Sequence, residues 1–164
     1  MKPIITTFAV LAALTAPSLS AAQETEGRRL AQLAFSQLDN ADRGYIDLGE
    51  YSIFGTDVFS SMDYDQDDSL SLSEFLNWDY GMLPLAQDAG REDAYYTALR
   101  VVFAFWDRNG DGAISKTEHR QSLNADFQRA DTDNDATLTS DEFTSGFSVM
   151  VALRAAINPA PVAE

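Results

Sequence analysis

The sequence predicts an all-α fold in which four helix–loop–helix units form two halves. Acidic segments of twelve residues begin at positions 39, 63, 107 and 131, so each half repeats at 24 residues and the halves repeat at 68. Apolar residues at helical spacing flank these segments. Each segment also has an aliphatic residue at its eighth position, namely Ile46, Leu70, Ile114 and Leu138. A fixed internal period of this kind indicates a repeat architecture.

The charge and composition exclude several classes of protein. Lys and Arg number 11 against 26 Asp and Glu, which gives a net charge of −15. Nucleic-acid binding is excluded on this ground, because phosphate contacts need a basic face. The absence of cysteine from the sequence excludes thiolate zinc sites and disulfides. Periodic apolar runs and 11% aromatic residues argue against disorder and for a folded domain or two small lobes.

Residues 1–22 have the features of a signal peptide. Lys2 supplies a positive start, and the apolar run 4–14 is too short to span a bilayer. A small-residue cleavage site at 20–22 predicts that the mature chain begins at Gln23. We therefore expect a periplasmic or secreted protein with no membrane span after cleavage. The alternative is a buried or anchoring N-terminal helix.

The rest of the chain divides at Gly81–Gly90, which is predicted to link the two halves. Residues 23–84 would contain the first two units, and residues 85–157 the third and fourth. Residues 158–164 contain two prolines and are predicted to form a flexible tail.

The acidic segment at 107–118, the third loop, has the strongest pattern, D-R-N-G-D-G-A-I-S-K-T-E. Oxygen-bearing side chains occupy every second position before Gly112, and a glutamate closes the segment. A hard cation such as Ca²⁺ takes six to eight oxygen ligands, which this spacing supplies. The predicted ligands are Asp107, Asn109, Asp111, the carbonyl of Ala113 and both oxygens of Glu118, with Ser115 acting through a water.

This segment matches D-x-[DN]-x-[DN]-G-x₅-E in full, and the chain here resembles the EF-hand family of calcium-binding proteins. The resemblance extends over roughly residues 24–155 and is to a calmodulin-like protein in a broad sense, of an exported bacterial type with closely spaced EF-hands. It implies four EF-hands, Ca²⁺ as the ligand, and short β contacts between paired loops through the aliphatic eighth positions. The alternative is a polar surface loop without a metal.

The second loop (63–74) and the fourth loop (131–142) follow the same pattern with one departure each. The glycine of the sixth position is replaced by Asp68 and by Ala136. Because alanine at positive φ costs roughly 1 kcal/mol, we expect calcium affinity to fall in the order third, second, fourth and first loop. The predicted ligands are Asp63, Asp65, Asp67, the Ser69 carbonyl and Glu74, and then Asp131, Asp133, Asp135, the Thr137 carbonyl and Glu142, with Ser71 and Thr139 acting through waters.

The first loop (39–50) is degenerate. Ala41 offers no side-chain oxygen at the third position, and Arg43 places a cation at the fifth. We expect this loop to be a metal-free structural unit, and weak calcium binding is the alternative.

Apolar positions predict the helices in order. Apolar helical faces precede the first and third loops, and one follows each of the four loops. The helix that follows the second loop is predicted to end at Pro84. These faces comprise Ala31, Ala34, Phe35 and Leu38; Tyr51, Phe54, Val58 and Met62; Phe75, Trp78 and Met82; Tyr95, Leu99, Val102, Phe103 and Trp106; Leu123, Phe127 and Ala130; and Phe143, Phe147, Met150 and Val151.

The spacing of the loops also predicts which of them pair. Only 12 residues separate Glu50 from Asp63, and 12 separate Glu118 from Asp131. A helix of that length runs about 18 Å and cannot go out and return. One helix shared by two loops would place them at its opposite ends, so that the second loop pairs with the third and the first with the fourth. The alternative is a break at Gly55 and Asn124 with local pairs.

Three functions are open at this point. The first is calcium binding without catalysis. The second is a calcium-dependent protein-interaction or regulatory module that exposes an apolar groove to an unidentified protein partner. Trp78 and Trp106 are candidates to line this groove. The third is an enzyme. Two observations argue against it: most clustered carboxylates are assigned to the loops, and the sequence contains one histidine, His119, which we expect to be solvated beside Glu118. No catalytic residue is predicted. Magnesium is a lesser candidate than calcium, because a bidentate glutamate suits the larger ion.

Overall fold

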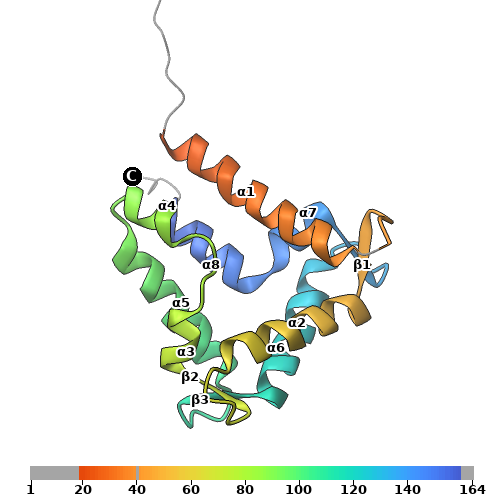
Figure 1. Cartoon of the computed structure of the whole chain (residues 1–164). Helices are drawn as coiled ribbons and strands as arrows, with labels where there is room; N and C mark the ends of the chain where they lie inside the picture. Colours follow the sequence, from red (N-terminus) through yellow and green to blue (C-terminus); the bar gives the residue numbers. More distant parts are fainter. Residues whose placement is uncertain (1–18, 40, 160–164) are drawn as a thin grey trace, which may run out of the picture.

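The computed structural model describes residues 19–39 and 41–159 of the chain (Figure 1). Within these residues there are eight helices and four short strands, and the all-α prediction is confirmed. In chain order the elements are α1 Leu19–Leu38, β1 Tyr45–Asp47, α2 Leu48–Met62, β2 Ser69–Ser71, α3 Leu72–Asn77, α4 Leu83–Asp88, α5 Glu92–Trp106, β3 Ala113–Ser115, α6 Lys116–Ala130, β4 Thr137–Thr139, α7 Ser140–Gly146 and α8 Ser148–Ile157.

Helices α2 and α6 are each shared by two loops, as the spacing predicts. α2 runs unbroken from the end of the first loop to the start of the second, and α6 joins the third and fourth loops in the same way. Both helices begin with a capping box, formed by Asp47 with Glu50 and by Ser115 with Glu118. The alternative, a break at Gly55 or Asn124, is wrong.

The loops pair across the two halves of the sequence. β1 pairs with β4 and β2 pairs with β3, both antiparallel. Ile46 lies opposite Leu138, and Leu70 lies opposite Ile114, all four of them buried. Figure 1 shows β1 at one end of α2, and β2 beside β3 at the other. The predicted pairing of first with fourth and second with third loop is confirmed.

Two apolar clusters form the core, and each draws on both halves of the sequence. One contains the end of α2 together with α3, α4, α5 and α8, and the other contains α1, the start of α2, α6 and α7. Phe147 packs against both clusters. The repeat visible in the sequence is therefore not a boundary between two separate cores.

Two helix predictions are wrong around Trp78 and Phe147. The helix after the second loop ends at Asn77, Trp78 is extended (ψ 141°), and Pro84 lies in the first turn of α4. The predicted linker Gly81–Gly90 thus contains a packed helix, since Ala86 is fully buried. Proline is tolerated in the first turn of a helix, where its missing N–H has no partner to lose.

The last predicted helix is two helices, α7 and α8, separated at Phe147 with ψ 111°. The buried Asp126 of α6 accepts hydrogen bonds from the backbone N–H of Ser148 (3.0 Å) and from its hydroxyl (2.7 Å). A charged acceptor at these first free N–H groups favours a new helix start. The apolar spacing alone does not show this break.

The chain ends remain predictions. Residues 1–18 of the predicted signal peptide and 160–164 of the predicted tail lie outside the described residues, and residues 19–22 begin α1. None of the helices that the structure describes is both long and apolar enough to cross a bilayer.

Candidate metal centres

The first aspartate of each loop holds the turn together. Asp63 accepts hydrogen bonds from the backbone N–H groups of Asp67 (3.1 Å) and Asp68 (3.2 Å). Asp131 accepts from Asp135 and Ala136, both at 3.1 Å. Asp107 in the same way accepts from Gly110, Asp111 and Gly112. The loops therefore curl around the carboxylate of their first residue.

The closing glutamate folds back onto its own loop. One oxygen of Glu74 accepts from the backbone N–H groups of Tyr64 (2.9 Å) and Asp65 (3.4 Å), and the other from the N–H (2.8 Å) and hydroxyl (2.7 Å) of Ser71. Glu118 and Glu142 repeat this arrangement with the groups of their own loops, which are Arg108, Asn109 and Ser115, and Thr132 and Thr139. Each glutamate thus bridges the start and the end of its loop.

These hydrogen bonds keep the glutamates charged. The Ser71 hydroxyl, with backbone N–H donors, lowers the pKa of Glu74, and the N–H and hydroxyl of Ser115 lower that of Glu118. The backbone N–H of Thr139 is the largest of the causes that lower the pKa of Glu142 to about 2. Deprotonated carboxylates are the form that a divalent cation binds.

Acidic side chains gather most closely in the second and fourth loops. Ligand atoms of Asp63, Asp65 and Asp67 lie within 4.8 Å of one another. The same holds for the group formed by Asp131, Asp133 and Glu142 in the fourth loop. In the third loop Asn109 stands in place of one carboxylate, and its amide donates to Asp111 at 2.8 Å. Calcium and other hard cations are bound by such clusters of oxygen atoms.

The residues predicted to ligate through a carbonyl each open a strand. Ser69, Ala113 and Thr137 are the first residues of β2, β3 and β4. Their N–H groups donate to the aspartates two positions earlier, at 2.9, 3.0 and 2.8 Å. The loop pairing therefore fixes the backbone at these seventh positions.

Each loop has a left-handed backbone at its fourth and sixth positions, and the sequence analysis predicted only the sixth. The sixth positions are left-handed as expected, with φ of 90° at Gly112, 68° at Asp68 and 66° at Ala136. The fourth positions also have positive φ, which the sequence analysis missed; they are Asp42, Gln66, Gly110 and Asn134. Asn, Asp and Gly favour this conformation and stand at the fourth position of three of the four loops, which was the available signal; Gln66 is the exception.

Arg43 supplies a cation inside the first loop. Its guanidinium forms an ion pair with Glu50, lies 3.6 Å from a carboxylate oxygen of Asp47, and sits 4.5 Å above the ring of Tyr45. Asp39 meanwhile accepts from the N–H groups of Arg43 (2.8 Å) and Gly44 (2.6 Å), as the first aspartates of the other loops do. The closing glutamate thus bonds to a fixed positive side chain. The sequence showed Arg43 as a missing ligand, but only the structure shows this contact.

His119 is buried, so the expectation that it is solvated is wrong. Its side chain is 4% exposed and packs edge-on against Phe59 and Trp106, with ring centroids 5.2 and 5.3 Å away. Burial lowers the pKa of His119 to about 4, which leaves the ring neutral at pH 7. His119 shares the buried face of α6 with Leu123 and Phe127, although its neighbour Glu118 is a candidate ligand.

Comparison with known proteins supports this geometry over one stretch of the chain. Residues 99–121, which contain the whole third loop and the end of α5, match the family model described as EF hand. No curated protein matches the chain.

Proposed function

We propose that this chain, whose residues 99–121 match the EF hand family model, is a calcium-binding protein with three functional sites, in the second, third and fourth loops, and a first loop that binds no calcium. The observation that carries the proposal is the position of Glu74, Glu118 and Glu142, each folded back onto its own loop. A glutamate in this position can offer both oxygens to an ion at the centre of the loop. The acidic groups of the second and fourth loops support the same conclusion.

Calorimetric titration with Ca²⁺ tests the number of sites. The unaltered chain should bind three ions. The triple variant Glu74→Gln, Glu118→Gln, Glu142→Gln should bind none, because each change removes the charge of a closing ligand while keeping its shape. The matched control is Glu50→Gln, which alters the same position in the first loop and should leave three ions bound. Uptake of calcium by the triple variant, or its absence in the unaltered chain at millimolar calcium, contradicts the proposal.

Calcium binding should also stabilise the fold. The chain has a net charge of −15, and in the ion-free protein the aspartates of each loop repel one another. Metal binding that relieves this repulsion adds its free energy to folding. Thermal unfolding should therefore move to higher temperature with calcium than with a chelator, and identical curves would argue against filled sites.

Export is part of the proposal and rests on the N-terminal sequence. A chain that begins at Gln23 in a periplasmic or secreted fraction would support it, and an intact N-terminus in the cytoplasmic fraction would contradict it. Mass spectrometry of the two fractions makes this distinction. Outside the cytoplasm, calcium sites of millimolar affinity would fit a structural role, and micromolar sites would fit a sensor.

A calcium-dependent interaction module is the second candidate. Trp78 and Trp106, the candidates to line a groove, both line one apolar cavity, but Trp106 is buried in the core and Trp78 is only partly buried. Exposed aromatic rings elsewhere favour this candidate instead, namely Tyr64 and Phe105, which are 90% and 75% exposed. Calcium-dependent capture of a partner that Phe105→Ala abolishes would support it.

A further inference from the structure

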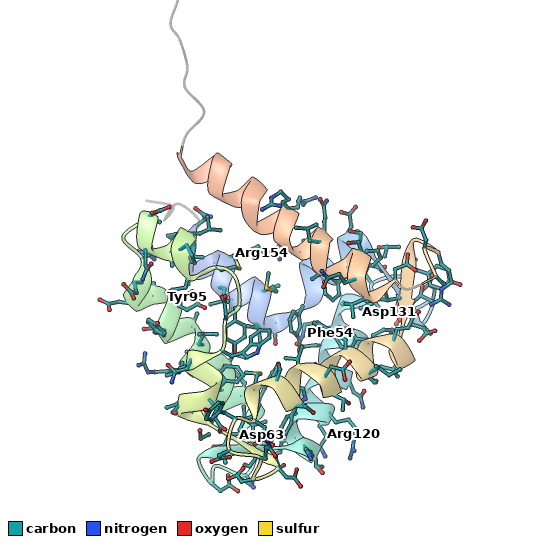
Figure 2. All side chains as sticks on the ribbon, viewed as in Figure 1. Phe54, Asp63, Tyr95, Arg120, Asp131 and Arg154 are labelled. Atoms are coloured by element: carbon teal, nitrogen blue, oxygen red, sulfur yellow. The ribbon has the colours of Figure 1, made fainter. Side chains whose placement is uncertain are left out.

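A cavity of about 250 Å³ lies where the two apolar clusters meet. Its walls come from α1, α2, α3, α6, α7 and α8, from the end of α5, and from residues 78–81 between α3 and α4. Figure 1 shows α1, α2 and α8 around this region, and Phe54, labelled in Figure 2, is one of the lining residues. Most of the residues that line the cavity are aromatic or aliphatic, whereas the four loops are acidic.

The lining points to an apolar occupant. Phe54, Val58, Phe75, Trp78, Trp106 and Met150 are representative of its walls. Water is poorly held in such a space, since it needs two or more polar partners, and an apolar cavity of roughly 150 Å³ already binds benzene. A cavity of the present size has room for a molecule with about two fused rings. Aromatic edges and faces around it suit an aromatic ligand.

The imidazole of His119 is a polar group that could orient a ligand in the cavity. His119 lines the cavity and is 4% exposed, and no hydrogen bond within the described part of the chain reaches its ring. The ring nitrogens of His119 are not among the fully buried polar atoms without a partner, so they keep some accessible surface, and a ligand that offers one hydrogen-bonding group could bond to one of them. Asp79 also lines the cavity and is exposed, and its negative charge would repel an anionic ligand.

We propose that this cavity binds a neutral aromatic small molecule of about two fused rings, with one hydrogen-bonding group directed to His119. The volume argues against a protein as the occupant, because a stable protein interface buries about 800 Å² on each partner, whereas this cavity holds a single small molecule or side chain. The proposal does not depend on which loops bind calcium.

A matched series of three ligands tests it on the unaltered full chain with calcium present. 2-Naphthol is neutral and carries one hydroxyl, naphthalene lacks the hydroxyl, and 2-naphthalenesulfonate adds a negative charge to the same rings. Titration calorimetry and the fluorescence of Trp78 and Trp106, the two tryptophans of the chain, report binding. We expect one 2-naphthol per chain, with affinity at least tenfold above that of the sulfonate and severalfold above that of naphthalene. No binding of 2-naphthol up to its solubility, or equal binding of the sulfonate, would overturn the proposal.

Variants that fill the cavity locate the bound molecule. Ala34→Phe on α1 and Val58→Phe on α2 each add a ring to the lining and should weaken 2-naphthol binding at least tenfold. Leu33→Phe on α1 is the control, because Leu33 is 47% exposed and should leave binding unchanged. His119→Phe should remove the preference for 2-naphthol over naphthalene. Calcium stoichiometry and circular dichroism of each variant separate a filled cavity from a misfolded chain. Unchanged binding in both filling variants would place the ligand elsewhere and refute the proposal.

Discussion

Leu70 of the second loop lies directly opposite Ile114 of the third, and both side chains are fully buried. Because the two loops share this pair of strands, calcium in one should order the other. Glu118→Gln should abolish the third site and lower the calcium affinity of the second by about 5- to 150-fold, the usual range of coupling between sites. Calorimetry of the variant measures this effect.

The fourth loop, which pairs with the first, provides the control. Glu142→Gln should abolish the fourth site and change the second and third sites much less. A Glu118→Gln variant that weakens the fourth site and spares the second would show that coupling does not follow the strand pairs.

The guanidinium of Arg43 pairs with Glu50, the closing residue of the first loop, so replacing Arg43 together with Ala41 by carboxylates should create a calcium site there. The double change Ala41→Asp, Arg43→Asp supplies carboxylates at the third and fifth positions, where the second and fourth loops have them. Calorimetry should then count one more calcium ion per chain. Arg43→Ala alone is the control and should add none. A double variant that still binds three ions would show that other features of the loop prevent binding.

Ala136 has a left-handed backbone, with φ of 66°. Ala136→Gly should raise the free energy of unfolding by about 1 kcal/mol and strengthen the fourth site, because glycine adopts this conformation without the clash of a Cβ. Urea unfolding and calcium titration measure the two effects. Ala125→Gly in the middle of α6 is a control that should instead destabilise by about 1 kcal/mol.

Gly146 lies where α7 packs closely on the end of α6. A Cβ added there would come within 2.5 Å of the Cα of Ala130, a backbone atom that cannot turn aside. Gly146→Ala should therefore destabilise the protein by about 1–3 kcal/mol, as other overpacking changes do. Gly55→Ala is the comparison, because its Cβ would meet the side-chain end of Leu123, which can change rotamer. Urea unfolding should rank Gly146→Ala as the more damaging change.

Asp47 caps α2 and makes part of the stability depend on pH. Its side chain accepts from the N–H of Glu50 at 3.0 Å, and this hydrogen bond lowers the pKa of Asp47 below its ordinary value of 3.8. A carboxylate with a lowered pKa stabilises the fold above its ordinary pKa and loses this contribution as pH falls through the lowered value. Asp47→Ala should lower the urea midpoint at pH 7, and the difference from the unaltered chain should shrink below pH 3.8. A difference that grows at low pH would contradict this role.

Much of the fold follows from local chemistry. The length between loops was enough to predict that α2 and α6 are each shared by two loops, and the structure shows that the glutamates closing the first and third loops also belong to the capping boxes that start these helices. The failures have a common cause. The end of α3 at Asn77 and the break at Phe147 depend on contacts with distant residues, such as Asp126 with Ser148, which apolar spacing does not encode.

The sequence by itself determined the four loops, their likeness to EF-hands and the departure of the first loop from the ligand pattern, because ligand type and spacing are properties of twelve consecutive residues. Tertiary structure alone decided that Arg43 neutralises Glu50, that His119 is buried, and that a cavity lies between the two clusters. These features arise where segments far apart in the chain pack together, and the free energy of that packing depends on shapes and distances that no local pattern contains.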